Sequence, residues 1–208
     1  MFLRFFLCVF SIYSVYAGGL SEDTLDKLIS KLNSDRIEYL FGSFGIEVME
    51  LNSSYFPNAR FSNLHSIDGN KKVMRTFAIV AFNEQMDDRL LNAHQEIQAG
   101  NSIGITLQKH GWKIEKVPVL FSSVKLSQKV RDLMTINGSE EAAVHVYRLD
   151  LSKDFNLNYC TIIEIHSPEY LSLDDLGYIY YDDFQKYSSL DLSSSLLLEK
   201  LVQLMDEF

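Results

Sequence analysis

Residues 60–82 read RFSNLHSIDGNKKVMRTFAIVAF, and this stretch predicts a β-hairpin. Asp68-Gly69 is a turn pair that tolerates positive φ angles. Residues 60–66 form the expected outgoing strand. Residues 72–82, which are rich in β-branched and aromatic side chains, form the expected returning strand. Both sides of the returning strand are apolar, so we expect other elements to cover it on both faces.

Arg75 is the charged residue in the middle of this returning strand. Strand alternation places Arg75 on the same side as Phe77, among residues that we expect to be buried. A buried guanidinium without a partner costs several kcal/mol, so Arg75 needs a countercharge. That partner is either Glu164 or another carboxylate of the chain, or it is a ligand carboxylate held by a planar two-pronged contact.

The rest of the chain predicts an α+β fold with a mainly antiparallel sheet and helices grouped around it. A second hairpin is expected from residues 141–151 and 158–166. Further strands are expected within residues 36–51 and 112–121. Apolar periodicity and capping residues predict helices at residues 21–34, 83–98, 101–109 and 126–134 and at the C-terminus, with residues 188–195 as a surface connection.

Glu164 lies within the apolar strand TIIEIH, residues 161–166, and shares one side with Ile162 and His166. A carboxylate in this setting is either paired with an arginine, for which Arg75 and Arg148 are candidates, or free to exchange a proton with a ligand. Glu164 is therefore a candidate catalytic residue.

Arg60 and residues 101–104 complete the candidate site. Arg60 lies across the first hairpin from the Arg75 strand, and only this neighbour distinguishes it from an ordinary surface arginine. Asn101 caps a predicted helix, and free amides at a helix start bind anions. The amide of Ile103 and the side-chain-free Gly104 would allow a ligand to approach closely. The alternative is a capped helix without a ligand.

Four motifs in this order resemble chorismate lyase and its wider superfamily, which includes the effector-binding domains of some transcription regulators. They are an arginine before an Asp-Gly hairpin, an Arg-Thr pair on the returning strand, a Gly step at a helix start, and a strand glutamate followed by a Pro turn and a Tyr. In this chain the motifs are Arg60, Arg75-Thr76, Ser102-Ile103-Gly104 and Glu164 to Tyr170. The resemblance covers over half of the chain and implies a chorismate lyase-like fold.

The resemblance also implies a reaction, the elimination of pyruvate from chorismate to leave 4-hydroxybenzoate. By this resemblance, Arg75 would hold one substrate carboxylate, and Arg60 the second carboxylate or the enolpyruvyl group. The Ile103 amide would add a hydrogen bond beside Gly104, and Glu164 would contact the ring hydroxyl and assist proton transfer. Such a lyase needs no metal or cofactor.

Two other interpretations remain open. The chain could be a non-catalytic module that binds a small carboxylate, because this architecture serves binding as readily as catalysis. Alternatively, Arg75 and Glu164 could pair with each other inside the core and serve stability alone.

The N-terminus predicts export. Arg4 followed by an apolar run to Tyr16, with small residues before Ala17, is typical of a signal peptide cleaved after Ala17. We expect a single domain over residues 18–208, periplasmic or secreted, without a membrane span after cleavage. Cys8 would leave with the signal peptide, so Cys160 alone forms no internal disulfide.

Composition excludes some partners. The formal net charge is −9, and the longest basic stretch is Lys71-Lys72, so we expect no nucleic-acid partner. The five histidines are scattered and give no metal-ligand spacing. The expected partner is a small carboxylate ligand. The sequence does not define the oligomeric state.

Overall fold

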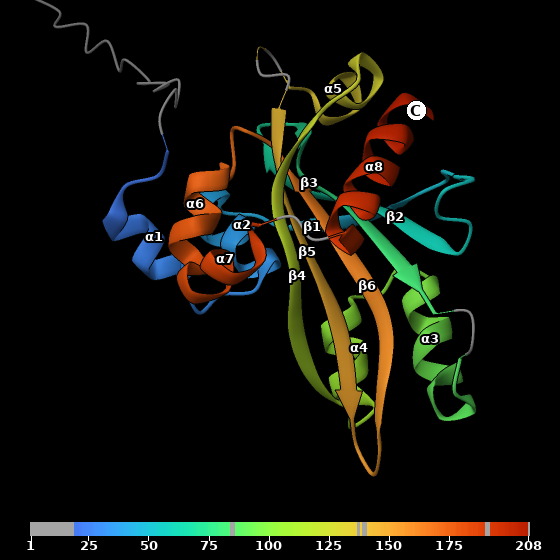
Figure 1. The fold of residues 1–208 in the computed structure, drawn as a ribbon. Helices are drawn as coiled ribbons and strands as arrows, with labels where there is room; N and C mark the ends of the chain where they lie inside the picture. Colours follow the sequence, from blue (N-terminus) through green and yellow to red (C-terminus); the bar gives the residue numbers. More distant parts are fainter. Residues whose placement is uncertain (1–18, 84–85, 137, 139–140, 190–191, 208) are drawn as a thin grey trace, which may run out of the picture.

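An antiparallel β-sheet forms the centre of the fold (Figure 1). The computed structural model describes residues 19–83, 86–136, 138, 141–189 and 192–207. Within these residues the sheet has six strands, and every neighbouring pair is antiparallel. In spatial order they are β1 (Gly45–Met49), β2 (Ala59–Asp68), β3 (Lys71–Phe82), β6 (Asn156–His166), β5 (Glu141–Ser152) and β4 (Lys113–Lys125).

Helices pack on both faces of this sheet, so the predicted α+β class is confirmed (Figure 1). They are α1 (Glu22–Leu28), α2 (Asn33–Phe41), the 3₁₀ turn η1 (Asp88–Leu90), α3 (Leu91–Gln98), α4 (Ile103–Lys109), α5 (Gln128–Met134), α6 (Leu173–Ile179), α7 (Tyr181–Tyr187) and α8 (Leu192–Glu207). Within the described part of the chain, no helix combines the length and the apolar character that crossing a membrane requires. The expected signal peptide at residues 1–17 lies outside the described residues.

One face of the sheet, called the α8 face here, packs against α5 and α8. Its strand residues include Phe77, Ile79, Ile163 and Ile165, and all of them are fully buried. Leu201 of α8 completes this apolar layer, and the cluster is the largest continuous core in the described residues. In Figure 1, α8 crosses in front of the strands.

The opposite face, called the α2 face here, carries Ala78, Val80, Ile162 and Glu164. Two separate apolar clusters cover it. Helices α1, α2, α6 and α7 contribute to the cluster that includes Ala78, and η1, α3 and α4 contribute to the one that includes Val80 (Figure 1). Because the two clusters do not merge, polar side chains can lie between them without breaking a continuous core.

The first hairpin turns one residue later than predicted and contains an unpredicted bulge. Asp68 pairs with Lys71, so the loop residues are Gly69, with a φ of 60°, and Asn70. Further along, Met74 pairs with His65 and Thr76 pairs with Leu64, so Arg75 is an extra residue in β3. Arg75 therefore points to the α2 face, where its guanidinium lies 3.6 Å from the ring centroid of Phe41. The prediction that Arg75 shares a side with Phe77 is wrong.

Several predicted elements differ from the structure near the N-terminus. Residues 36–51 were expected to be strand-like, but α2 occupies residues 33–41 and only β1 is a strand. Gly42, with a φ of 73°, ends α2 in the left-handed conformation. The helix expected at residues 21–34 is two helices, because α1 ends at Leu28.

Towards the C-terminus, α6 and α7 were not predicted. The expected connection at residues 188–195 is partly the first turn of α8. The helix expected from residue 83 consists, in the described residues, of η1 and α3.

Gly45 is the position where β1 meets the buried ring of His65. A Cβ added there would lie 2.5 Å from the ring Nε2. We expect Gly45→Ala to lower the free energy of unfolding by about 1–3 kcal/mol, because the added methyl group would clash with this buried ring and force it to shift. Urea unfolding measures this.

Gly104→Ala is the matched control. A Cβ on Gly104 meets nothing within 4 Å, and alanine favours a helix, so we expect a gain of about 0.5–1 kcal/mol. Equal stabilities for the Gly45→Ala variant and the unaltered chain would contradict the packing of β1 on His65.

Candidate functional site

Glu164 is buried between the two helix groups of the α2 face and is only 5% exposed. Its Oε1 accepts a hydrogen bond from Asn33 Nδ2 at 3.0 Å and from the Tyr147 hydroxyl at 3.2 Å. Among the described residues, neither of the two arginines expected as partners pairs with it. Arg75 faces Glu169, and Arg148 makes a bidentate pair with Asp150. Glu164 is thus held by neutral donors.

Two histidines face the second oxygen of Glu164. His145 Nδ1 lies 3.8 Å and His166 Nε2 lies 3.9 Å from Oε2, which is too far for hydrogen bonds. Thr76 Oγ1 and His166 Nδ1 are hydrogen-bonded at 3.1 Å. Both ring nitrogens of His145, and Nε2 of His166, are buried without a hydrogen-bond partner. Unpaired buried nitrogens of this kind require explanation, since nearly all buried polar atoms in proteins are bonded.

Burial keeps the two histidines of this cluster uncharged. Desolvation lowers the pKa of His166 to about 4, although the nearby Glu164 acts in the opposite direction. Desolvation, with repulsion from His166, Lys116 and Arg36, holds the pKa of His145 well below its usual range. Both imidazoles are therefore uncharged near neutral pH, and each ring has one donor and one acceptor nitrogen.

The ring of His145 is fixed by aromatic neighbours. It stacks on Phe121 with centroids 4.5 Å apart and planes inclined by 9°, and the Tyr180 centroid lies 4.6 Å away. Because β5 and these rings restrict its rotation, His145 presents its nitrogens to a fixed position beside Glu164. The imidazole can therefore donate to or accept from a group placed there.

Arg75 is engaged away from Glu164. Its Nε donates to Ser66 Oγ at 2.9 Å, its guanidinium stacks on Phe41, and Glu169 lies 4.0 Å from Nη1. Desolvation lowers the pKa of Arg75, and attraction to Glu169 partly opposes that shift. The dry Arg75–Glu164 pair, which was one sequence-based alternative, is not formed.

Arg60 is joined to the segment that precedes α4. Its Nη1 donates to the carbonyl of Ile97 at 2.7 Å and to that of Asn101 at 3.2 Å. The guanidinium thus links the end of α3 to the segment before Ile103 and Gly104. Arg60 is 5% exposed, and its Nε is buried without a partner. Desolvation lowers its pKa.

Strand register shows how Arg60 and Glu164 are related. Ser62, Ala78 and Glu164 stand in one row across β2, β3 and β6, and Arg60 heads the next row beside Val80. Arg60 and Glu164 are therefore on the same face, two strand spacings or about 10 Å apart across the sheet. Ser62 Oγ lies between them and is also buried without a partner. Ser62 and Ala78 are small, so the middle of this strip carries little side-chain bulk.

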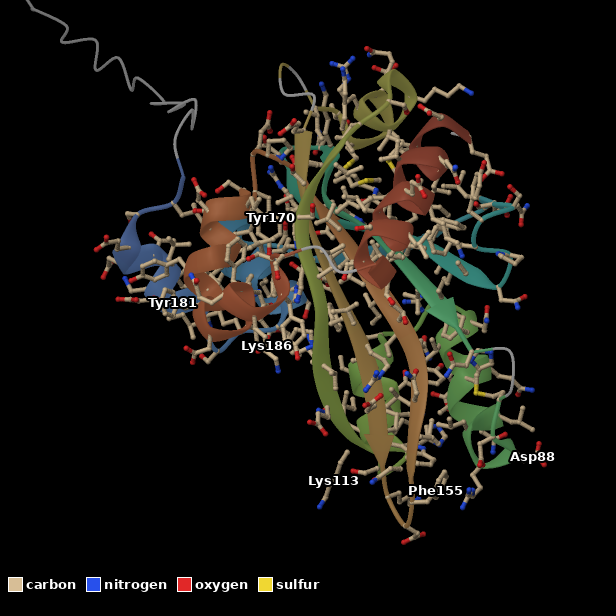
Figure 2. All side chains as sticks on the ribbon, viewed as in Figure 1. Asp88, Lys113, Phe155, Tyr170, Tyr181 and Lys186 are labelled. Carbon is tan, nitrogen blue, oxygen red and sulfur yellow. The ribbon has the colours of Figure 1, made fainter. Side chains whose placement is uncertain are left out.

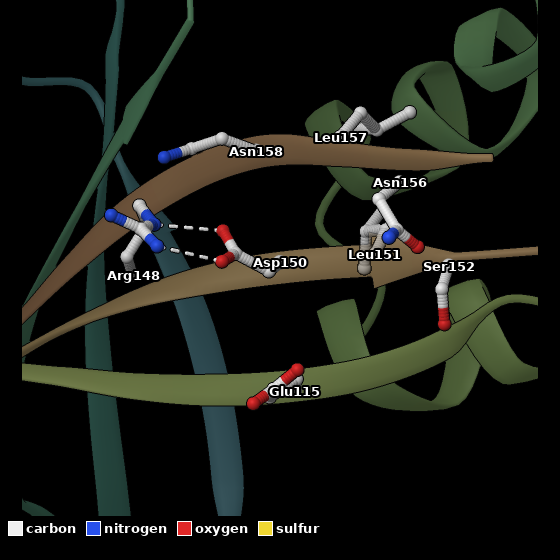
Figure 3. Close-up of a pocket in the computed structure, with 8 residues that line it drawn as sticks. All are labelled: Glu115, Arg148, Asp150, Leu151, Ser152, Asn156, Leu157 and Asn158. Atoms are coloured by element: carbon white, nitrogen blue, oxygen red, sulfur yellow. Dashed lines mark hydrogen bonds and ion pairs between the residues drawn. The ribbon is translucent and has the colours of Figure 1, made fainter.

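Two surface hollows lie elsewhere. One, of about 450 Å³, is on the β4–β5–β6 arm (Figure 3). It is lined by polar side chains that include Glu115, Asn158 and the Arg148–Asp150 pair. The other, of about 490 Å³, lies beside β1 and includes Glu47 and Leu133. None of Arg60, Arg75 and Glu164 lines either of them, so these hollows do not define the candidate site.

Neither the comparison with known proteins nor a search for metal-binding side chains in the described residues assigns a function to the chain. No protein-family model matches the chain, and no curated protein sequence matches it. The chorismate lyase-like resemblance therefore stays a prediction. In the described residues, no group of three or more His, Cys, Asp and Glu side chains has the arrangement to hold a metal ion.

The structure adds His145, Tyr147 and Asn33 to the site that the sequence suggested. His145 and Tyr147 alternate along β5 as Glu164 and His166 do along β6, and the two strands are neighbours. Paired polar residues on the same side of two apolar strands are a signal that could have identified this cluster. Asn33 carries no such signal, because it comes from a helix far away in the sequence.

The buried histidines make stability depend on pH. The pKa of His166 is about 4 in the folded chain and near 6.5 when unfolded, so its stabilising effect is complete above pH 6.5 and falls as the pH drops towards 4. From about pH 7 to about pH 5 we expect the free energy of unfolding to fall by about 2 kcal/mol through His166 alone. His145 adds to the fall in the same direction. Urea unfolding at both pH values measures the change.

His166→Gln should flatten this pH dependence. Equal slopes for the His166→Gln variant and the unaltered chain would contradict a neutral, buried His166.

Proposed function

We propose that this protein binds a small organic acid on the α2 face, with the ligand carboxylate at Arg60. The guanidinium of Arg60 carries the proposal. It is buried, its Nε has no partner, and no described Asp or Glu side chain forms an ion pair with it. A carboxylate placed against Nε would supply both the missing hydrogen bond and the missing countercharge.

The energetic argument rests on how a fold tolerates a buried, unpaired cation. The two carbonyls that accept from Nη1 offset part of the desolvation cost, and Ile97 O lies at the negative end of α3. They do not neutralise the charge. An anionic ligand would gain a charge-assisted, two-pronged contact in a place where water screens little.

The opposite end of the strip suits a hydrogen-bonding group of the ligand. Glu164 accepts hydrogen bonds, and the free nitrogens of His145 and His166 are neutral. A ligand hydroxyl could donate to the carboxylate and accept from an imidazole. An aromatic hydroxy acid such as 4-hydroxybenzoate combines this group with a carboxylate on a flat ring that suits the small Ser62 and Ala78.

The same geometry supports binding more than lyase chemistry. Chorismate has two carboxylates, and the resemblance would assign one of them to Arg75. That guanidinium is already engaged by Ser66, Phe41 and Glu169. Among the predicted arginines, only Arg60 has a fully buried guanidinium nitrogen without a hydrogen-bond partner, so a monoacid fits better than a dianion. We therefore favour a non-catalytic carboxylate-binding module, and its export to the periplasm or the exterior belongs to the same proposal.

Arg60→Gln tests the anchor. We expect the purified protein to bind 4-hydroxybenzoate, and Arg60→Gln to weaken that affinity at least about tenfold, because a buried charge partner is lost. Isothermal titration calorimetry measures both affinities. Arg148→Gln removes an arginine that already has Asp150 as its partner and should leave the affinity unchanged. Equal affinities in the Arg60→Gln variant and the unaltered chain, or no binding by the unaltered chain, would contradict the proposal.

A second measurement separates binding from catalysis. We expect the protein incubated with chorismate to release 4-hydroxybenzoate no faster than a protein-free solution, because Arg75 is engaged. Chromatography of the mixture over time gives both rates. Faster release that Glu164→Gln abolishes would contradict the binding module and support the lyase.

A further inference from the structure

Asn33, the first residue of α2, reaches into the polar strip of the α2 face. Its side chain is 6% exposed, and Nδ2 donates to Glu164 Oε1 at 3.0 Å and to Thr76 Oγ1 at 3.3 Å. Its Oδ1 accepts a hydrogen bond of 2.7 Å from Tyr170, which is labelled in Figure 2. A primary amide is thus bound at this position through both its donor and its acceptor, as a ligand would be.

This use of asparagine differs from its usual role at a helix start. Asparagine side chains near a helix N-terminus ordinarily accept from free backbone amides. Here Leu32 is the N-cap residue and no side chain caps α2. The polar groups of Asn33 are all directed to residues on β3, on β6 and after β6. The contact therefore fixes α2 on the sheet and adds nothing to the helix end.

Asn33 is not the only anchor of helix α2, because Arg36 donates hydrogen bonds to the carbonyls of Leu28 and Ile29 and to the hydroxyl of Tyr180. Gly42 ends the helix in the left-handed conformation, and a Cβ at Gly42 would meet nothing within 4 Å. The link before it includes Ile29 and Leu32, which are both exposed. Because Glu164, His145 and Asn33 are all nearly inaccessible, a ligand can reach the carboxylate only after part of this cover moves.

We propose that Asn33 is an internal occupant of the ligand site, which a hydroxyl or primary amide on the ligand displaces. This inference rests on the proposed function and specifies it. The ligand then carries a carboxylate for Arg60 and, opposite it, an uncharged group that both donates and accepts. Displacement of Asn33 lowers the apparent affinity, because only the fraction of molecules with Asn33 undocked can bind.

Three probes and two variants test this inference by calorimetry. The probes are 4-hydroxybenzoate, 4-carbamoylbenzoate and benzoate. Asn33→Ala should strengthen the binding of the first two by about tenfold, since one or two hydrogen bonds no longer compete. Benzoate has no group that replaces the amide, so its affinity should stay unchanged. Ser34→Ala, at the partly exposed neighbouring position, should alter no affinity.

Hydrogen exchange on the unaltered chain tests the same inference without a variant that could unfold. Saturating 4-hydroxybenzoate should speed amide exchange across α2, while benzoate should not. Slower exchange in α2 with 4-hydroxybenzoate would overturn the inference. It would mean that Asn33 stays docked and contacts the ligand.

The outcomes separate the two proposals. If 4-hydroxybenzoate binds the unaltered chain and the Asn33→Ala variant equally, or binds the variant more weakly, Asn33 is not a competitor while the carboxylate site stands. If no probe binds the unaltered chain, the proposed function fails, whatever the Asn33→Ala variant binds. If no probe binds either protein, the proposed function fails and this inference fails with it.

Discussion

Asn33 and Tyr147 donate hydrogen bonds to the same oxygen of Glu164, and the arrangement of the α2 face follows from this buried carboxylate. A carboxylate inside a sheet costs several kcal/mol unless donors reach it. The donors come from α2 and β5, two elements that are distant in the sequence. The contact therefore fixes where α2 lies, and it prevents the two apolar clusters of this face from joining.

Beside the buried Glu164 carboxylate, a line of polar atoms lacks hydrogen-bond partners. Nitrogens of His145 and His166 lie beside Glu164 without partners, and Ser62 Oγ and Arg60 Nε continue the line across β3 to β2. On the α8 face, Asn63 has a buried Oδ1 without a partner, but no row of such atoms crosses several strands in the described residues. Folds keep unsatisfied polar groups chiefly where function requires them. The asymmetry between the two faces is why the α2 face is the candidate site and the surface hollows are not.

Sequence patterns predicted the strands well, because alternation and β-branched runs are set by local burial. The Gly69-Asn70 turn, one residue later than predicted, sets the register of the first hairpin. Residues 36–41 were wrongly predicted as strand-like, because Ile37, Tyr39 and Phe41 occupy alternate positions as in a strand. They form part of helix α2, and of these three residues only Ile37 is fully buried. Helix formation there depends on packing against α1, β2 and Tyr180, which no local pattern records.

The candidate site was only partly predictable for related reasons. Glu164 was identifiable as a charge within an apolar strand, whereas the hydrogen bond from Arg60 to the carbonyl of Asn101 was not predicted. The bulge that turns Arg75 towards Phe41 could not be recognised in the sequence. One extra residue changes the sheet face on which a side chain lies, but it leaves the apolar pattern of the strand unchanged. Asn33 was not predictable, because its partners are 43 and 131 residues away in the chain.

A crystal structure of the protein grown with 4-hydroxybenzoate tests the central claim most directly. The account predicts the ligand on the α2 face, with its carboxylate against Nε of Arg60 and its hydroxyl within hydrogen-bond distance of Glu164. A ligand bound only in the hollow beside Arg148, or crystals at saturating ligand whose α2 face holds none, would contradict it.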